Sequence, residues 1–164
     1  MNQQTHLTKH VEALRTAIQV AFPDRPFLGS ITAVDGLTNE ELDEQRALYS
    51  ALRGRKWSEI PLPVIESNPD GIVLLTDEAF IAFLPAWLTH ALAHEKIREL
   101  LIYVFSPAVH ASMKKMDQRI RLLNSMQMEA LRGFLEFSFS TENSTYIKEQ
   151  AAHALTYVER VRNT

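Results

Sequence analysis

The stretch Ile72–Leu92, which reads IVLLTDEAFIAFLPAWLTHAL, decides the fold. Thr76 is a good helix N-cap, and Asp77 and Glu78 follow it, where negative charge suits the positive end of a helix dipole. Past this cap, apolar residues recur at spacings of three and four and so share one helix face: Phe80, Leu84, Trp87, Leu88 and Ala91. Further apolar residues widen that stripe, and a helix that is apolar most of the way round is buried on most sides. We therefore expect residues from about 77 to 93 to form the central helix of the domain.

Pro85 lies inside this expected helix. A proline in a helix interior removes one backbone hydrogen bond and clashes with the carbonyl four residues earlier, here that of Ile81, at a cost of roughly 3 kcal/mol. The sequence therefore predicts a kink near residues 81–84, or two short helices that meet there. Such a bend either lets the central helix follow its neighbours, which is the usual cause, or opens a small pocket beside Trp87.

Two segments of the chain carry a recognisable pattern. The first reads Trp57-x-Glu59-Ile60 and then Leu75-Thr76-x-Glu78-Ala79-Phe80-x-x-Phe83-Leu84-Pro85-Ala86-Trp87-Leu88. The second reads Asn124-x-x-Gln127 followed by Phe134-Leu135-Glu136. Together they resemble a family of small bacterial helical proteins for which no activity is established. The resemblance implies a bacterial, cytosolic, mainly helical protein, and it supplies no catalytic residues.

Length and composition favour one soluble domain, residues 1–164, with a sizeable core. Cysteine is absent, which excludes disulfides, thiolate metal sites and a cysteine nucleophile. The formal net charge of −3 disfavours nucleic acid as the main partner, because that binding neutralises phosphates with Lys and Arg.

No stretch is apolar enough to span a bilayer, since charged residues and His90 interrupt the longest apolar run. The first ten residues, MNQQTHLTKH, lack the layout of a signal peptide. We expect a cytoplasmic protein with no membrane partner and no cofactor.

Helices are also expected on both sides of the central segment. A four-three-four repeat of apolar residues predicts a helix over about residues 5–21: Leu7, Val11, Leu14 and Ile18. Thr38 and Glu41 form a capping box at the start of the next helix, and Leu37 with Leu42 forms a hydrophobic staple. Gly54 supplies its left-handed stop. Its buried stripe is expected to be Leu42, Leu48, Tyr49 and Leu52.

Shorter signals divide the remainder of the chain. Ile31–Val34 is a candidate extended piece, Pro61 and Pro63 suit a short helix, and Asn68–Gly71 reads as a type I turn. Helices are expected from Ile97 to Val104, from Val109 to Ile120, from Asn124 or Ser125 to about Phe139, and from about Ile147 to Val161. The helix expected from Val109 to Ile120 should carry its cations on the solvent-facing side: Lys114, Lys115, Arg119 and Arg121. The fold class is therefore all-α, a single bundle-like array of about six to seven helices.

Negative charge is densest around the second helix. Asp35, Glu40, Glu41, Asp43 and Glu44 lie within ten residues. Their plainest interpretation is a solvated helix face with first-turn acids that suit the dipole. The functional interpretation is an acidic surface, formed by Asp35, Glu40, Asp43 and Glu44, that steers a basic partner protein.

His90 and His94 lie one helical turn apart, a spacing that can present two imidazoles to one metal. No third ligand has a spacing that points to it, and the H-E-x-x-H signature is absent, so we expect no metal site. The basic run Arg53–Lys56 beside Trp57 is small for a nucleic-acid contact, and Trp57 suits a core anchor better.

The chain contains neither a G-x-x-x-x-G-K phosphate loop nor a G-x-S-x-G nucleophile elbow. Our leading hypothesis is a non-enzymatic protein-binding module with another protein as its partner, and specifically an immunity-type, toxin-neutralising bacterial protein. The alternative is a small enzyme or ligand-binding protein with a pocket near Pro85. That pocket would be lined by Phe83, Trp87, His90 and His94, with Trp87 as a wall and a histidine as the acid–base group.

Overall fold

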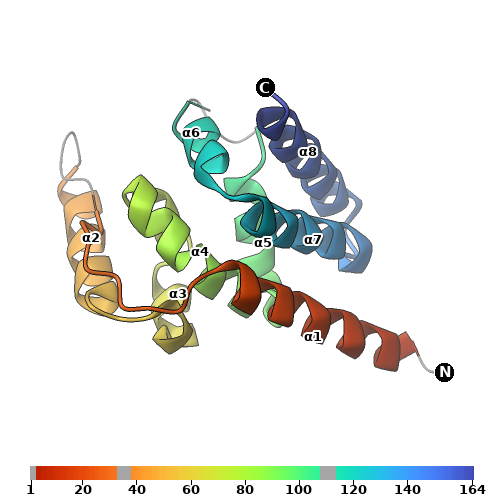
Figure 1. Ribbon diagram of the computed structural model, residues 1–164, viewed down its shortest axis with the longest axis horizontal. Helices are drawn as coiled ribbons and strands as arrows, with labels where there is room; N and C mark the ends of the chain where they lie inside the picture. Colours follow the sequence, from red (N-terminus) through yellow and green to blue (C-terminus); the bar gives the residue numbers. More distant parts are fainter. Residues whose placement is uncertain (1–2, 33–37, 108–113) are drawn as a thin grey trace.

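A computed structural model describes residues 3–32, 38–107 and 114–164 of the protein, and this part of the chain is all-α (Figure 1). The α-helices are α1 (Gln3–Ala21), α2 (Asn39–Leu52), α3 (Leu62–Ser67), α4 (Asp77–Ala91), α5 (Glu95–Val104), α6 (Lys114–Leu122), α7 (Ser125–Thr141) and α8 (Thr145–Arg162). Two 3-10 helices, η1 (Trp57–Glu59) and η2 (Gly71–Leu74), lie between them. The all-α, bundle-like class is confirmed.

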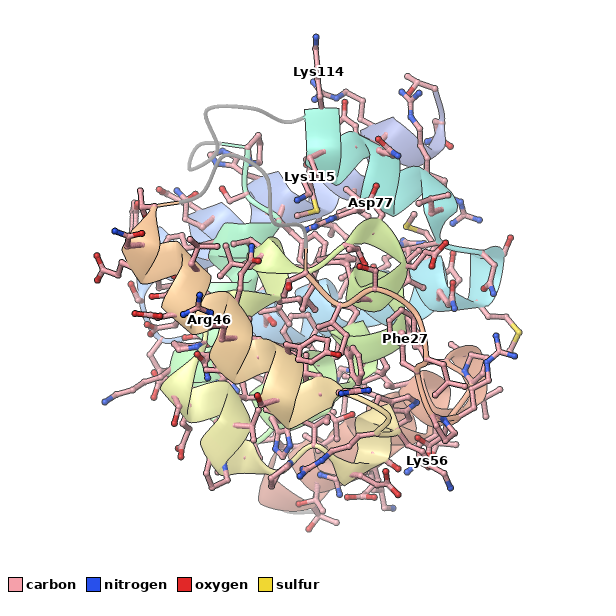
Figure 2. The ribbon with its side chains drawn as sticks, turned by 90° about the vertical axis from the view of Figure 1, so that its left-hand side faces the viewer. Phe27, Arg46, Lys56, Asp77, Lys114 and Lys115 are labelled. Carbon is pink, nitrogen blue, oxygen red and sulfur yellow. The ribbon has the colours of Figure 1, made fainter. Side chains whose placement is uncertain are left out.

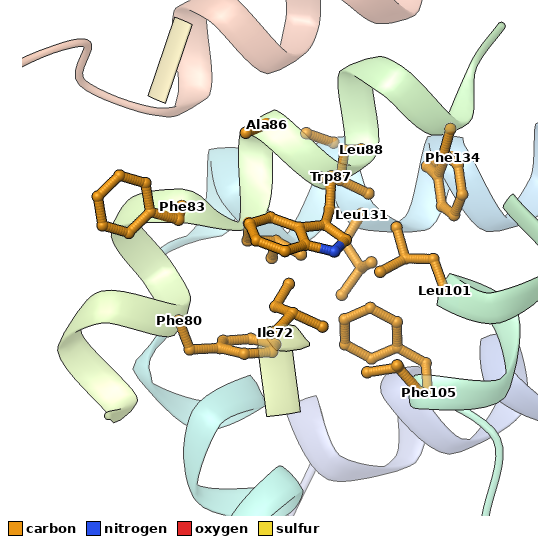
Figure 3. Close-up of a cluster of buried hydrophobic side chains, with 14 of the residues drawn as sticks. Ile72, Phe80, Phe83, Ala86, Trp87, Leu88, Leu101, Phe105, Leu131 and Phe134 are labelled. Atoms are coloured by element: carbon orange, nitrogen blue, oxygen red, sulfur yellow. The ribbon is translucent and has the colours of Figure 1, made fainter. Parts of the chain in front are cut away.

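The central helix is α4, as the sequence predicts. It packs against α1, α5, α6, η1 and η2. The hydroxyl oxygen of Thr76 accepts the Ala79 N–H at 3.2 Å, which confirms the N-cap. Trp87 is fully buried, and Figure 3 shows its indole among the side chains of Ile72, Leu101 and Leu131. Burial on nearly all sides is what an almost wholly apolar helix requires.

Pro85 does not divide this helix. α4 continues through it from Asp77 to Ala91, so the alternative of two short helices is not found. The proline ring is itself buried. Packing on several sides of α4 supplies the stabilisation that offsets the backbone hydrogen bond lost at Ile81.

α7 packs against α8, and α1 packs alongside α7 (Figure 1). α1 and α7 run antiparallel, because Leu14 lies at Gly133 while His10, further back on α1, stacks edge-on against Phe137 at 5.5 Å. A Cβ atom on Gly133 would lie 2.9 Å from Leu14, so the glycine permits the close approach of the two helices.

α2 lies at the periphery and packs mainly on η2. Leu48 and Leu52 are buried, and Gly54 has φ +67°, which confirms the left-handed stop. Tyr49 is 42% exposed, so its expected place in the buried stripe is wrong. The helix expected over about residues 5–21 is confirmed as α1, although Leu7 of its apolar repeat is 46% exposed. The physical reason is that a helix with few neighbours buries only a narrow face, and the edge positions of its apolar stripe face water.

Several local predictions agree with the structure. Asn124 caps α7 in a capping box with Gln127. The Asn68–Gly71 turn closes with the Gly71 N–H donating to the Asn68 carbonyl at 3.0 Å, and residues 97–104 are helical. Thr32 forms an isolated antiparallel bridge with Leu75, within the expected extended piece. The Thr38–Glu41 box, the staple at Leu37, Asp35 and residues 109–113 fall outside the residues and side chains described.

None of the described helices is both long enough and apolar enough to cross a membrane.

Candidate functional site

A cleft opens where the end of α1 meets α4 and the start of α7. Its volume is about 370 Å³. Apolar side chains supply most of the lining, and Arg25, Glu78 and Gln127 are its polar groups: the complete set is Phe22, Pro23, Arg25, Pro26, Phe27, Glu78, Ile81, Ala82 and Gln127. Small-molecule sites combine apolar walls with a few polar groups in clefts of this size, so the cleft has the dimensions and lining of a ligand site.

The wall formed by residues 22–27 is fixed by bonds to the segment that follows α2. The indole N–H of Trp57 donates to the Phe22 carbonyl at 3.3 Å, and the Phe27 N–H donates to the Arg55 carbonyl at 3.2 Å. Trp57 is buried, which confirms its expected role as a core anchor. This wall is therefore preformed, since both of its ends are bonded to another part of the chain.

A buried arginine joins α6 to the start of α4. Arg119 is 1% exposed, and its Nε donates to the Asp77 carboxylate at 3.0 Å. Its Nη2 donates to the carbonyls of Val73 and Leu75, and the guanidinium lies 4.5 Å from the centre of the Phe80 ring. Burial lowers the pKa of Arg119, and the hydrogen bond and charge of Asp77 oppose that shift. The expectation that Arg119 lies on the solvent-facing side of α6 is therefore wrong. Its hydrogen-bond partners replace the water that burial removes, so the guanidinium can be buried.

The other cations of α6 do face solvent. Lys114, Lys115 and Arg121 are exposed, and Figure 2 shows Lys115 on the same side of the molecule as Asp77. Partial burial and the neighbouring charge of Arg119 lower the pKa of Lys115, whereas Asp77 raises it. Asp77 therefore acts on Lys115 through its charge and on Arg119 through a direct ion pair.

Figure 2 shows Arg46 of α2, which lies among three acidic residues of that helix that the structure describes. Glu40, Asp43 and Glu44 are all exposed. Asp43 pairs with Arg46 at 3.3 Å, and both of these side chains are more than three-quarters exposed. Exposed pairs of this kind are weak, so Asp43 can exchange this contact for another at little cost. Among the described residues, Glu40 and Glu44 have no ion-pair partner.

The residues expected to line a pocket beside Pro85 occupy two environments. Phe83 and Trp87 are fully buried, and the indole N–H of Trp87 donates to the Pro69 carbonyl at 3.0 Å. His90 and His94 are partly buried, with ring centres 6.4 Å apart, and His90 Nε2 lies 2.9 Å from the Ile60 carbonyl. The cleft described above lies one turn earlier on α4, at Ile81 and Ala82.

Carboxylates at the junction of α5 and α7 come close together. One oxygen from each of Glu95, Glu99 and Glu142 lies within 4.8 Å of the others, a spacing that could hold a cation. Arg98 already pairs with Glu142 at 2.6 Å and donates to the Ala91 carbonyl at 3.2 Å. The arginine therefore supplies the positive charge that this cluster requires.

A second, more open hollow runs between α1 and α7, with a volume of about 540 Å³. Its lining is mostly apolar and small: Ala13, Thr16, Ala17, Val20, Ala21, Ser125, Met126, Glu129 and Ala130. Val20 is 64% exposed and Met126 is 54% exposed. Exposed apolar side chains beside a hollow mark this groove as a second surface at which another molecule could lie.

The fold defines the class of the protein, a small all-α domain built around one buried helix. Residues 12–161 match the sequence model of DUF6714, a family of unknown function, and the chain therefore belongs to that family. This agrees with the resemblance to a family without an established activity. No curated protein and no solved structure matches the chain.

Proposed function

We propose that the protein is a non-enzymatic protein-binding module that docks through the outer face of α2 onto a basic surface of its partner. One observation carries the proposal: Glu40, Asp43 and Glu44 share the solvent-facing side of a peripheral helix. Because these three side chains are exposed, a partner can reach their carboxylates without a rearrangement of the described part of the fold.

The charges on this face are available for binding. Glu40 and Glu44 have no ion-pair partner among the described residues, and the pair of Asp43 with Arg46 is solvent-exposed. A surface of this kind attracts a basic partner over several ångströms and raises the association rate more than the final affinity. The effect falls with ionic strength, because the screening length is about 10 Å at 0.1 M salt.

Small size and an acidic balance support a finer proposal, an immunity-type bacterial protein that neutralises a toxin in the cytoplasm. The net charge of −3 and the acidic face of α2 suit a toxin whose active surface is basic. A protein of this kind needs no catalytic groups, since it acts by covering the active surface of the toxin.

The experiment compares partner capture by tagged wild-type protein and by Glu40→Lys/Glu44→Lys. The double variant Glu66→Lys/Glu149→Lys is the control, because it changes the net charge equally at exposed acids outside α2. The captured partner is then used to measure association rates at low and moderate salt. The proposal predicts a slower association rate, by roughly tenfold or more, for the α2 variant alone at low salt.

An unchanged association rate for the α2 variant would contradict docking at this face. Val20→Asp/Met126→Asp provides a separate arm, since both side chains are exposed in the groove between α1 and α7. If only this variant loses the partner, the groove and not α2 is the docking surface, and the proposed site is wrong.

A further inference from the structure

The cleft between α1, α4 and α7 contains two opposite charges that do not neutralise each other. Arg25 and Glu78 both line it, and both are exposed. Neither side chain forms an ion pair or a hydrogen bond with any described residue, so their charged groups are not in contact across the cleft. Each is therefore free to contact a bound molecule.

The acid next to Arg25 in the sequence is already engaged. The carboxylate of Asp24 accepts the backbone N–H of Ser58 at 3.3 Å and its hydroxyl at 2.6 Å. Asp24 thus fixes the wall of the cleft, and its bonds point toward η1. The guanidinium of Arg25 remains available to a carboxylate from outside the chain, for which its planar geometry is well suited.

Gln127 adds a directional group. It is 7% exposed, and its side-chain carbonyl accepts the Asn124 N–H at 3.0 Å in the capping box of α7. With that oxygen occupied, its amide group has N–H donors to offer the cleft. A carboxylate or carbonyl of a ligand is the matching acceptor.

The rest of the wall is apolar and rigid. Phe22 is buried, and Phe27 packs edge-on against Phe83 with ring centres 5.6 Å apart. Pro23 and Pro26 restrict the backbone of the same wall, since a proline ring fixes φ. These surfaces accept an apolar body, and a preformed site loses little entropy when a ligand binds.

We propose that this cleft binds a small zwitterion with an apolar side chain, of the size of an amino acid or a dipeptide. Its carboxylate lies at Arg25 and Gln127, its ammonium group lies at Glu78, and its apolar part lies against Phe22, Phe27 and Ile81. A simple anion would leave Glu78 unpaired beside it, and a simple cation would leave Arg25 unpaired. A volume of about 370 Å³ is at the small end of the range for ligand sites, which suits a molecule of this size.

L-phenylalanine is the probe, because its ring protons report binding directly in saturation-transfer NMR and its titration can be followed on amide signals of the protein. N-acetyl-L-phenylalanine, which lacks the ammonium group, and L-phenylalanine amide, which lacks the carboxylate, are the matched probes. We expect L-phenylalanine to shift signals of residues that line the cleft, and each blocked probe to bind roughly tenfold or more weakly, the effect of one lost charged contact.

Protein variants that remove one charge should each abolish one part of this discrimination. Glu78→Gln should bind L-phenylalanine and its N-acetyl derivative alike, and Arg25→Gln should bind L-phenylalanine and its amide alike. Arg53→Gln is the control, an exposed arginine just after the end of α2, and should behave as wild type. Lack of any shift at millimolar L-phenylalanine, equal binding of all three probes to the wild type, or unchanged selectivity in both cleft variants would each overturn the proposal. Because α2 takes no part in the cleft, these outcomes are independent of the docking proposal.

Discussion

The replacement Arg119→Met tests whether the buried arginine fastens α6 to α4. Methionine keeps an unbranched apolar stem of similar length, but it cannot donate to the Asp77 carboxylate or to the carbonyls of Val73 and Leu75. Removal of one partner of a buried pair costs roughly 3–5 kcal/mol when the other charge is left buried. Asp77 is 25% exposed and lies in the first turn of α4, so water and the helix dipole compensate part of that cost.

We therefore expect the lower end, about 3 kcal/mol of unfolding free energy, most of it from the two carbonyls left without a donor. For a chain of this length, 1 kcal/mol corresponds to roughly 2–4 °C in Tm, so the midpoint should fall by roughly 6–12 °C. Urea unfolding followed by the fluorescence of Trp87 and Trp57 gives the free energy directly. Arg121→Met is the control, since Arg121 is exposed on the same helix, and its effect should stay within about 0.5 kcal/mol.

Equal stability of Arg119→Met and Arg121→Met would refute this reasoning, because it would mean that the buried bonds contribute nothing beyond packing. The double variant Arg119→Met/Asp77→Asn separates the ion pair from the carbonyl bonds. If the ion pair dominates, the second substitution should recover stability, since it removes the charge that Arg119→Met leaves without its partner.

Three further predictions each concern a single residue. Burial and the hydrogen bond to Asp117 raise the pKa of Tyr157, so the folded state holds this proton more tightly than the unfolded state. The stability that results is complete below about pH 10 and is lost as the pH rises above it. In urea unfolding measured from pH 8 to 11, the free energy of unfolding should therefore decline less steeply for Tyr157→Phe than for the wild type. Gly54→Ala should cost about 1–2 kcal/mol, because φ is +67° there, and a calorimetric Tm equal to that of the wild type would contradict this. Trp87→Phe should cost about 2–3 kcal/mol in urea unfolding, because it leaves a space in the core and the Pro69 carbonyl without its donor; a loss below 0.5 kcal/mol, on the order of a neutral surface change, would count against it.

The sequence predicts the helices well because their signals are local. The caps at Thr76 and Asn124 and the stop at Gly54 depend on residues within one turn, and the structure confirms all three. The burial of α4 follows from its composition alone. The predicted burial of Tyr49 is wrong because periodicity shows which face is apolar, whereas the number of neighbouring helices decides how much of that face is covered.

The sites are less predictable, since they arise from residues far apart in the chain. Arg25, Glu78 and Gln127 meet in one cleft only because α1 and α7 both pack beside α4. Pro23 and Pro26 around Arg25 are the one local hint of a rigid polar loop. Arg119 looks like any surface cation by spacing, and its burial depends on the carbonyls that η2 leaves free. Glu40, Asp43 and Glu44 are exposed on α2, which is compatible with both of their interpretations.

The most direct test of the docking account is the association rate of the captured partner with wild-type protein and with Glu40→Lys/Glu44→Lys at low salt. The account predicts that the variant associates roughly tenfold or more slowly, that Glu66→Lys/Glu149→Lys matches the wild type, and that the difference shrinks as salt rises. Equal association rates for wild type and the α2 variant at low salt would contradict it.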